Sequence, residues 1–199
     1  NGFATFLIPA VLMLIIQQTL LLGVGMAAGT AREKNAFRNL VPVERHHRGL
    51  LRIVMGKGAA YLLVYIPLSV YVLVVVPHLF HLNQIGNPWD VAFFVLPFLI
   101  ACIAFSMTVS AFVRHREMCI MLIVFTSVPL LFISGLSWPG SAVPPVWKAI
   151  SYIFPSTFGI NGFVAINNMG ATLGDVQHDW YMLWAQAGIY VITTCAVYK

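Results

Sequence analysis

The sequence predicts an all-α integral membrane fold with a single transmembrane domain over 1–199. Of its 199 residues, 60% are hydrophobic and only 9% are charged, whereas a soluble domain has about 25% charged residues. Five apolar stretches carry no Asp, Glu, Lys or Arg, and each is close to the ~20 residues that a helix needs to cross ~30 Å of hydrocarbon. Helices are expected because a spanning helix satisfies its own backbone hydrogen bonds.

The predicted spans cover about 3–28, 58–80, 91–113, 118–138 and 180–198. Each of the first four contains one proline, which membrane helices tolerate when neighbouring groups satisfy the freed carbonyl: Pro9, Pro67, Pro97 and Pro129. The three cysteines lie inside spans without the paired spacing of a metal site or a disulfide framework. We interpret them as packing residues.

Charge sets the predicted orientation. Successive connectors lie on alternate sides of the membrane, and the Lys and Arg residues are divided very unequally between the two sides. One side has only Lys148. The other side has the remaining ten: Arg32, Lys34, Arg38, Arg45, Arg48, Arg52, Lys57, Arg114, Arg116 and Lys199. Because basic loops face the cytoplasm, we expect the first and third connectors and the C-terminus to be cytoplasmic and Asn1 to lie outside. The net charge of +5 is therefore a topology signal, and we expect no nucleic-acid partner. An odd number of spans that begins outside, without an initiator Met, suggests that more chain precedes Asn1.

The cytoplasmic segment 29–57 divides at Pro42. Before it, Phe37, Leu40 and Val41 lie at i, i+3 and i+4, which predicts a short helix with one apolar face. After it, apolar residues of 50–54 alternate with arginines, which predicts a helix in the membrane interface before the chain turns into the bilayer. Binding of anionic membrane lipid alone would explain the basic residues.

The outer segment 139–179 is rich in Pro, Gly, Asn and aromatic residues. Pro144 and Pro145 predict the start of a helix over 146–154. Ser156 is a candidate cap for a second helix over 157–168, which Gly170 would close. Both helices are expected to lie shallowly in the outer leaflet.

Enzyme signatures are incomplete in this sequence. It has no HExxH zinc motif, the pair Ser134-Gly135 lacks the first glycine of a GxSG serine site, and Gly56-Lys57 lacks the rest of a P-loop. The spans contain no ionisable Asp, Glu, Lys or Arg for a proton relay. We therefore assign no catalytic, cofactor-binding or metal-binding residue to the chain, and energy for any transport should come from elsewhere.

Gln17 and Gln18 are the polar residues of greatest interest in the spans. Two amides near mid-span are costly in hydrocarbon, and at ~100° apart around a helix they cannot face the same partner. We expect at least one of them to face a pathway or a subunit interface, and Ser134 is a third candidate for such a position. Helix packing is the alternative interpretation for all three.

The motifs and their order resemble the permease subunits of type-2 ABC exporters, the ABC-2 family, in its bacterial multidrug-efflux-like branch. The resemblance rests on several segments in order, namely Gln17-Gln18 with the small residues that follow, GTAREKN at 29–35, Val41-Pro42, Gly56-Lys57, ISGLSWPGSAVPPVW at 133–147, IFPSTFGINGF at 153–163 and NNMGA at 167–171. Family members usually have six spans, so the chain resembles spans two to six.

The resemblance implies a coupling helix at about 32–41 that fits a groove of the ATPase subunit. Its residues here are Arg32, Glu33, Lys34, Phe37, Arg38, Leu40 and Val41. The sequence at 33–38 departs from the Glu-x-Gly-Thr pattern common in the family. The resemblance also implies short outer re-entrant helices that close the exit, with turns shaped by Gly135, Pro139, Pro144, Pro145, Pro155, Gly159 and Gly162.

By this resemblance the chain is the permease of an ATP-driven exporter in a bacterial inner membrane, moving an amphiphilic or hydrophobic substrate outward. The implied partners are a second permease in a homo- or heterodimer, a cytoplasmic ATPase that binds ATP and Mg, and in some systems a periplasmic adaptor. Two alternatives come from other classes. One is a membrane enzyme with an outer site of His78, His81 and His178, and the other is a non-catalytic scaffold or channel.

Overall fold

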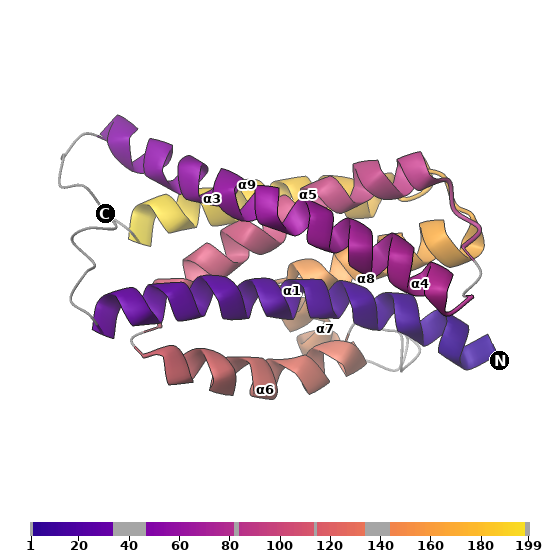
Figure 1. Cartoon of the computed structure of the whole chain (residues 1–199), viewed down its shortest axis with the longest axis horizontal. Coiled ribbons are helices and arrows are strands. Elements are labelled where there is room, and N and C mark those ends of the chain that lie inside the picture. The colour runs from indigo at the N-terminus through magenta and orange to yellow at the C-terminus, as the bar shows by residue number, and fades with distance from the viewer. Residues whose placement is uncertain (1, 34–46, 82–83, 114, 134–143, 198–199) are drawn as a thin grey trace.

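The computed structural model describes residues 2–33, 47–81, 84–113, 115–133 and 144–197, and every regular element in these ranges is helical (Figure 1). The prediction of an all-α fold is confirmed for them. The elements are α1 (Gly2–Glu33), α3 (His47–Val70), the π-helix η1 (Tyr71–Val75), α4 (Val76–Leu79), α5 (Pro88–Ser110), α6 (Arg116–Ile133), α7 (Pro145–Ser151), α8 (Pro155–Met169) and α9 (Gln177–Val197).

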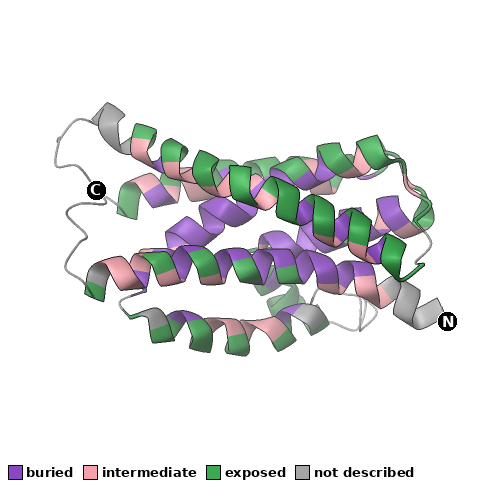
Figure 2. Cartoon of the chain, in the orientation of Figure 1, coloured by how far each residue is buried: buried purple, intermediate pink, exposed green. Residues whose placement is uncertain are grey.

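Helix α5 occupies the centre of an elongated bundle. It packs against α1, α8 and α9, while α6 lies along the other side of α1 (Figure 1). Most residues of α5 are buried, whereas α3 is exposed along much of its length (Figure 2). The core is made of large side chains from α1, α5 and α8, including Met13, Ile16, Leu20, Phe94, Phe98 and Phe163.

Several helices have the length and apolar composition of membrane spans, so the chain is a multi-pass membrane protein. Within the described residues, three helices qualify singly, and the bent pair α7 and α8 qualifies together: Leu7–Ala31, Leu51–Leu79, Pro88–Ser110 and Pro145–Ser151 with Pro155–Met169. The apolar part of α6, Glu117–Leu130, is shorter. The predicted number of five spans, which included α6 and α9, stays a prediction.

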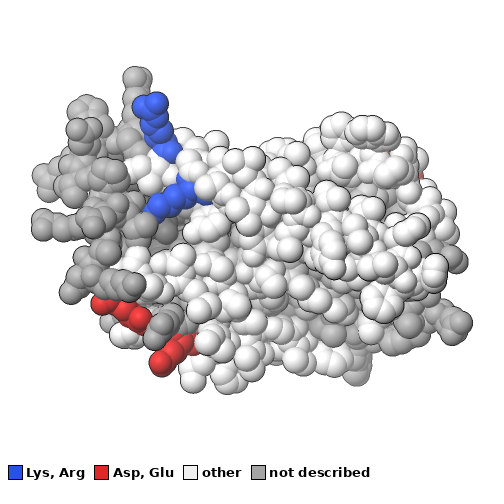
Figure 3. Space-filling model, viewed as in Figure 1, with Lys and Arg blue, Asp and Glu red and all other residues white. Residues whose placement is uncertain are grey.

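The connectors sort into two sets at opposite ends of the bundle. The last residues of α1, α5 and α9 and the first residues of α3 and α6 lie at one end (Figure 1). This is the end where charge predicted the cytoplasm. On the face shown in Figure 3, most of the coloured charged side chains of the described residues gather at this same end.

Two expectations about the segment 29–57 change. Helix α1 is 32 residues long, about 48 Å, so it extends past ~30 Å of hydrocarbon, and its last two residues are Arg32 and Glu33. Helix α3 is continuous from His47 to Val70, so residues 50–54 belong to the same helix as the predicted span and do not form a separate one. Their position in the membrane interface stays a prediction. The remaining predicted coupling residues lie outside the described part: Lys34, Phe37, Arg38, Leu40 and Val41.

The prolines of the first four predicted spans all lie inside helices, as expected. Pro67 is followed four residues later by the start of η1. A proline removes one helical hydrogen bond, and π-helical segments widen the turn near such defects. The Gln84 side-chain amide donates to the carbonyl of Leu73 within η1 at 2.8 Å, which helps this irregular turn to satisfy its backbone.

Candidate functional site

The outer segment forms a bent pair of helices. Helices α7 and α8 meet at 89°, and we refer to the intervening residues 152–154 as the break. Pro145 and Pro155 are the first residues of α7 and α8, where a missing N–H costs nothing. Gly170 closes α8 in the left-handed conformation with φ +66°, as predicted. Ser156 as a side-chain cap is wrong, because Pro155 starts the helix one residue earlier and Ser156 lies inside it.

The break lies at the edge of the bundle, between buried ends of the two helices. Tyr152 and Ile153 are exposed and Phe154 is half-buried, whereas Ser151, Ser156 and Thr157 on either side are buried. Helix α8 packs against α1, α5 and α9. A helix interruption exposes backbone N–H and C=O groups that no helical turn satisfies. At membrane depth such groups are tolerated where other parts of the protein bind them.

Gln17 of α1 binds the start of α8. Its Oε1 accepts a hydrogen bond of 2.6 Å from the backbone N–H of Ser156, and both side chains are only 1% exposed. The Cys102 thiol of α5 is 3.8 Å from the same oxygen. An N-cap side chain accepts a hydrogen bond from an N–H group in the first turn of its own helix. Gln17 accepts such a bond from the first turn of α8, although it belongs to another helix.

Helix α9 binds the carbonyls of the break. Gln186 Nε2 donates to the Tyr152 carbonyl at 2.6 Å, and the Tyr190 hydroxyl donates to the Ile153 carbonyl. From α8 itself, the Thr157 hydroxyl donates to the Ser151 carbonyl at 2.6 Å. Side chains of three helices thus satisfy the backbone around the break.

Some polar atoms at this site remain without a hydrogen-bond partner among the described residues. They are Gln17 Nε2, Ser156 Oγ and Gln186 Oε1, all buried. Gln18 faces the other way, where its Nε2 is 3.4 Å from the Thr126 hydroxyl of α6. The two glutamines therefore face different helices, as their spacing predicts.

Gly159 and Gly162 were expected to shape turns, and this is wrong, because both lie inside α8. A Cβ atom at Gly159 would lie 2.4 Å from the Phe98 ring, and one at Gly162 would lie 2.2 Å from the Phe94 ring. These glycines let two rings of α5 approach the α8 backbone. Ser134, Gly135 and Pro139 lie outside the described residues, and Pro144 directly precedes α7.

The loops after α4 and α8 pack against the end of α8. The N–H of Ile85 donates to the Asn167 carbonyl at 3.0 Å. In the next loop, the backbone N–H and the hydroxyl of Thr172 donate to Asp175 Oδ2 at 2.9 and 2.8 Å. These bonds hold the pKa of the Asp175 carboxyl below its usual value, because they favour the charged form.

The histidines do not form a metal site in the described part of the chain. His78, His81 and His178 are exposed, and no three His, Cys, Asp or Glu residues among those described are grouped to hold an ion. His178 instead contacts the Phe158 ring edge to face. The alternative of an outer histidine site therefore has no support in this geometry.

The sequence reasoning missed Gln186 and Tyr190. They lie at i and i+4 on α9, so they share a face, and both are polar side chains in a predicted span. This spacing could have marked a polar face directed at a neighbour. It could not have identified the break as that neighbour.

A family model described as "ABC-2 family transporter protein" matches residues 1–196. The chain belongs to this family. The ABC-2 protein is thus a membrane permease of an ABC transporter, a class that works with an ATPase subunit. Neither the curated proteins nor the solved structures contain a significant match.

Proposed function

We propose that this ABC-2 permease is half of an ATP-driven exporter that carries an amphiphilic or hydrophobic substrate outward across a bacterial inner membrane. The single observation that carries the proposal is the break between α7 and α8, whose carbonyls and following N–H group are bound by side chains of α9 and α1. A helix pair interrupted in this way is suited to be an outer gate, because its hydrogen bonds to neighbouring helices can be exchanged as those helices move.

Helix α1 provides a mechanical link between the gate and the cytoplasmic end. Gln17 lies sixteen residues before Glu33, the last residue of α1, which is about 24 Å along a helix. The predicted coupling segment follows directly. An ATPase that pushes on this segment would therefore move Gln17 relative to the first turn of α8.

The energy needed at the gate is small. Release of the buried Ser156 N–H by Gln17 costs about 1 to 3 kcal/mol, which is within the reach of a nucleotide-driven step. A second permease would complete the pathway, with the substrate leaving between the two copies. The apolar walls of the described bundle suit an uncharged or amphiphilic substrate.

The coupling part of this proposal is tested with a cognate ATPase subunit co-expressed with the permease. Phe37→Asp and Leu40→Asp place a charge on the apolar face of the predicted coupling helix. We expect permease-dependent ATP hydrolysis to be lost while membrane insertion is retained. Asn39→Asp adds the same charge off that face and should leave hydrolysis unchanged. Normal stimulation by the Phe37 and Leu40 variants would contradict the proposal.

A further inference from the structure

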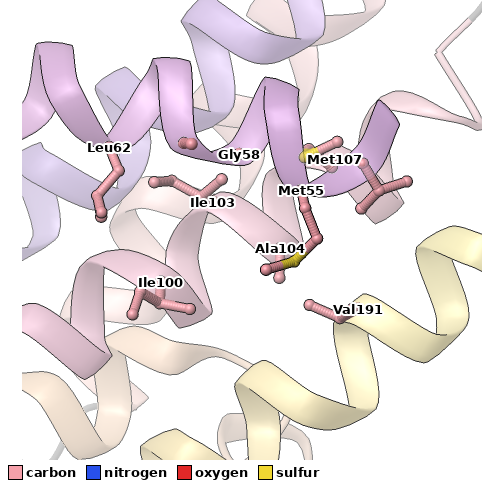
Figure 4. A pocket seen from close by; sticks show the side chains of 10 residues that line it. Met55, Gly58, Leu62, Ile100, Ile103, Ala104, Met107 and Val191 are labelled. Atoms are coloured by element: carbon pink, nitrogen blue, oxygen red, sulfur yellow. The ribbon is translucent and has the colours of Figure 1, made fainter. Parts of the chain in front are cut away.

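Two apolar cavities lie along the seam between α3 and α5. The inner one has a volume of about 190 Å³ and is lined by side chains of α3, α5 and α9, among them Met55, Gly58, Leu62, Ile103 and Met107 (Figure 4). The outer one has a volume of about 240 Å³ and is lined by residues of α3, η1 and α5, among them Ile66, Leu73, Val91 and Leu99.

The two cavities follow one another along α3 and η1. Met55, Leu62, Ile66 and Leu73 recur at helical spacing, so they share one face of α3 and η1. The 18 helical steps from Met55 to Leu73 rise about 27 Å, close to the ~30 Å thickness of the hydrocarbon. The seam is thus lined with apolar side chains across most of the bilayer.

The size of the inner cavity selects its occupant. A helix ~10 Å in diameter occupies roughly 80 Å³ for each ångström of its length, so a helix could lie over the open side of the cavity of about 190 Å³ but could not enter it. A thin, flexible alkyl chain can enter it. Gly58 and Ala104 keep the space open, and Met55 and Met107 have flexible side chains that adapt to irregular apolar ligands.

A basic side chain next to the inner cavity indicates which kind of lipid head group would bind there. Arg52 lies three residues before Met55, so the two side chains are neighbours on the same side of α3. Arg52 is exposed, and it belongs to the end of the bundle where charge predicts the cytoplasm. The inner leaflet carries anionic lipid that attracts basic side chains near its surface.

We propose that the inner half of the α3–α5 seam is a binding site for an anionic phospholipid, with one acyl chain in the cavity and the head group on Arg52. This site is independent of ATP and of the transport cycle, so its test needs only the purified chain.

Two glycines of α3 provide a matched pair of variants. A Cβ atom at Gly58 would lie 3.9 Å from Ile103 and so point into the cavity, whereas one at Gly56 meets nothing within 4 Å. Gly58→Leu fills the cavity, and Gly56→Leu adds the same side chain outside it. Ala104→Leu fills the same cavity from α5. Unfolding temperatures of all three show whether the fold is retained.

The probe is phosphatidylglycerol with a photoreactive acyl chain, in vesicles of phosphatidylcholine and phosphatidylglycerol that contain the full chain. We expect cross-linking to residues of the inner cavity. It should fall by about tenfold or more in Gly58→Leu and Ala104→Leu, because several methylene groups lose their buried site, and it should stay at the wild-type level in Gly56→Leu. Equal cross-linking in all variants, or cross-links that map outside the cavity, would overturn the proposal.

The head-group arm uses Arg52→Gln, with Lys57→Gln as the control for loss of charge. Competition by unlabelled lipid measures the preference for phosphatidylglycerol over phosphatidylcholine. We expect this preference to fall about fivefold in Arg52→Gln and to be unchanged in Lys57→Gln. An equal loss in both variants would show general charge attraction and refute the assigned site.

Discussion

At the scale of single residues, the two adjacent glutamines of α1 have different roles. Gln17 binds a backbone N–H of α8 at 2.6 Å, and that N–H belongs to the first turn of a buried helix. Gln18 makes a contact of 3.4 Å with the Thr126 hydroxyl. Thr126 also donates to the Leu122 carbonyl at 2.6 Å, so it is satisfied without Gln18. The cost of removing each amide should therefore differ.

We expect Gln17→Leu to lower the free energy of unfolding by about 1 to 3 kcal/mol, because it leaves the Ser156 N–H buried without an acceptor. Gln18→Leu should cost less than about 1 kcal/mol, since its contact is at the long end of the hydrogen-bond range. Unfolding in mixed micelles measures both. Equal costs would contradict the assignment of Gln17 as the cap of α8.

At the scale of elements, the position of α8 depends on two glycines that let its backbone lie close to aromatic rings of α5. Gly159 and Gly162 face the rings of Phe98 and Phe94, and this contact brings α8 against the central helix α5. The rings are among the most buried side chains of the protein. A methyl group at either glycine has no space unless a ring or the helix moves.

Gly159→Ala and Gly162→Ala should each destabilise the protein by about 1 to 3 kcal/mol through overpacking. Gly188→Ala in α9 is the control, because a Cβ atom there meets nothing within 4 Å, and it should be neutral or stabilising by up to about 1 kcal/mol. Thermal unfolding in detergent compares the three. A neutral Gly162→Ala would show that α8 is not held by this contact. Combined with Phe94→Leu, Gly162→Ala should regain part of its lost stability.

Local signals predicted the elements better than their contacts. Pro145, Pro155 and Gly170 mark helix ends through their own backbone preferences, so the ends of α7 and α8 were readable within a few residues. The bond from Ser156 to Gln17 joins residues 139 positions apart, and no local pattern encodes that distance. The prediction for Gly159 and Gly162 was wrong for the same reason. From the local sequence a glycine indicates a turn, and its role in a close contact between helices is recognised only when the neighbouring aromatic ring is known.

At the scale of the whole molecule, the two proposed working regions meet α1 at its last turn and at its middle. The predicted coupling segment follows the last turn of α1, and Gln17 reaches the break between α7 and α8 from its middle. Membership of the ABC-2 family accounts for a permease that relies on an ATPase subunit. In the account proposed above, α1 carries the motion of that subunit to the outer gate.

The most direct test of this account is thiol labelling at Ser156, in a permease whose native cysteines are replaced and which is assembled with its ATPase. A membrane-impermeant maleimide is applied from the outside to Ser156→Cys, with Thr172→Cys in the exposed outer loop as the positive control. Ser156 is 1% exposed, so the account predicts protection without ATP, labelling during ATP turnover, and labelling without ATP once Gln17→Leu is added. Unchanged protection of Ser156→Cys during turnover would contradict it.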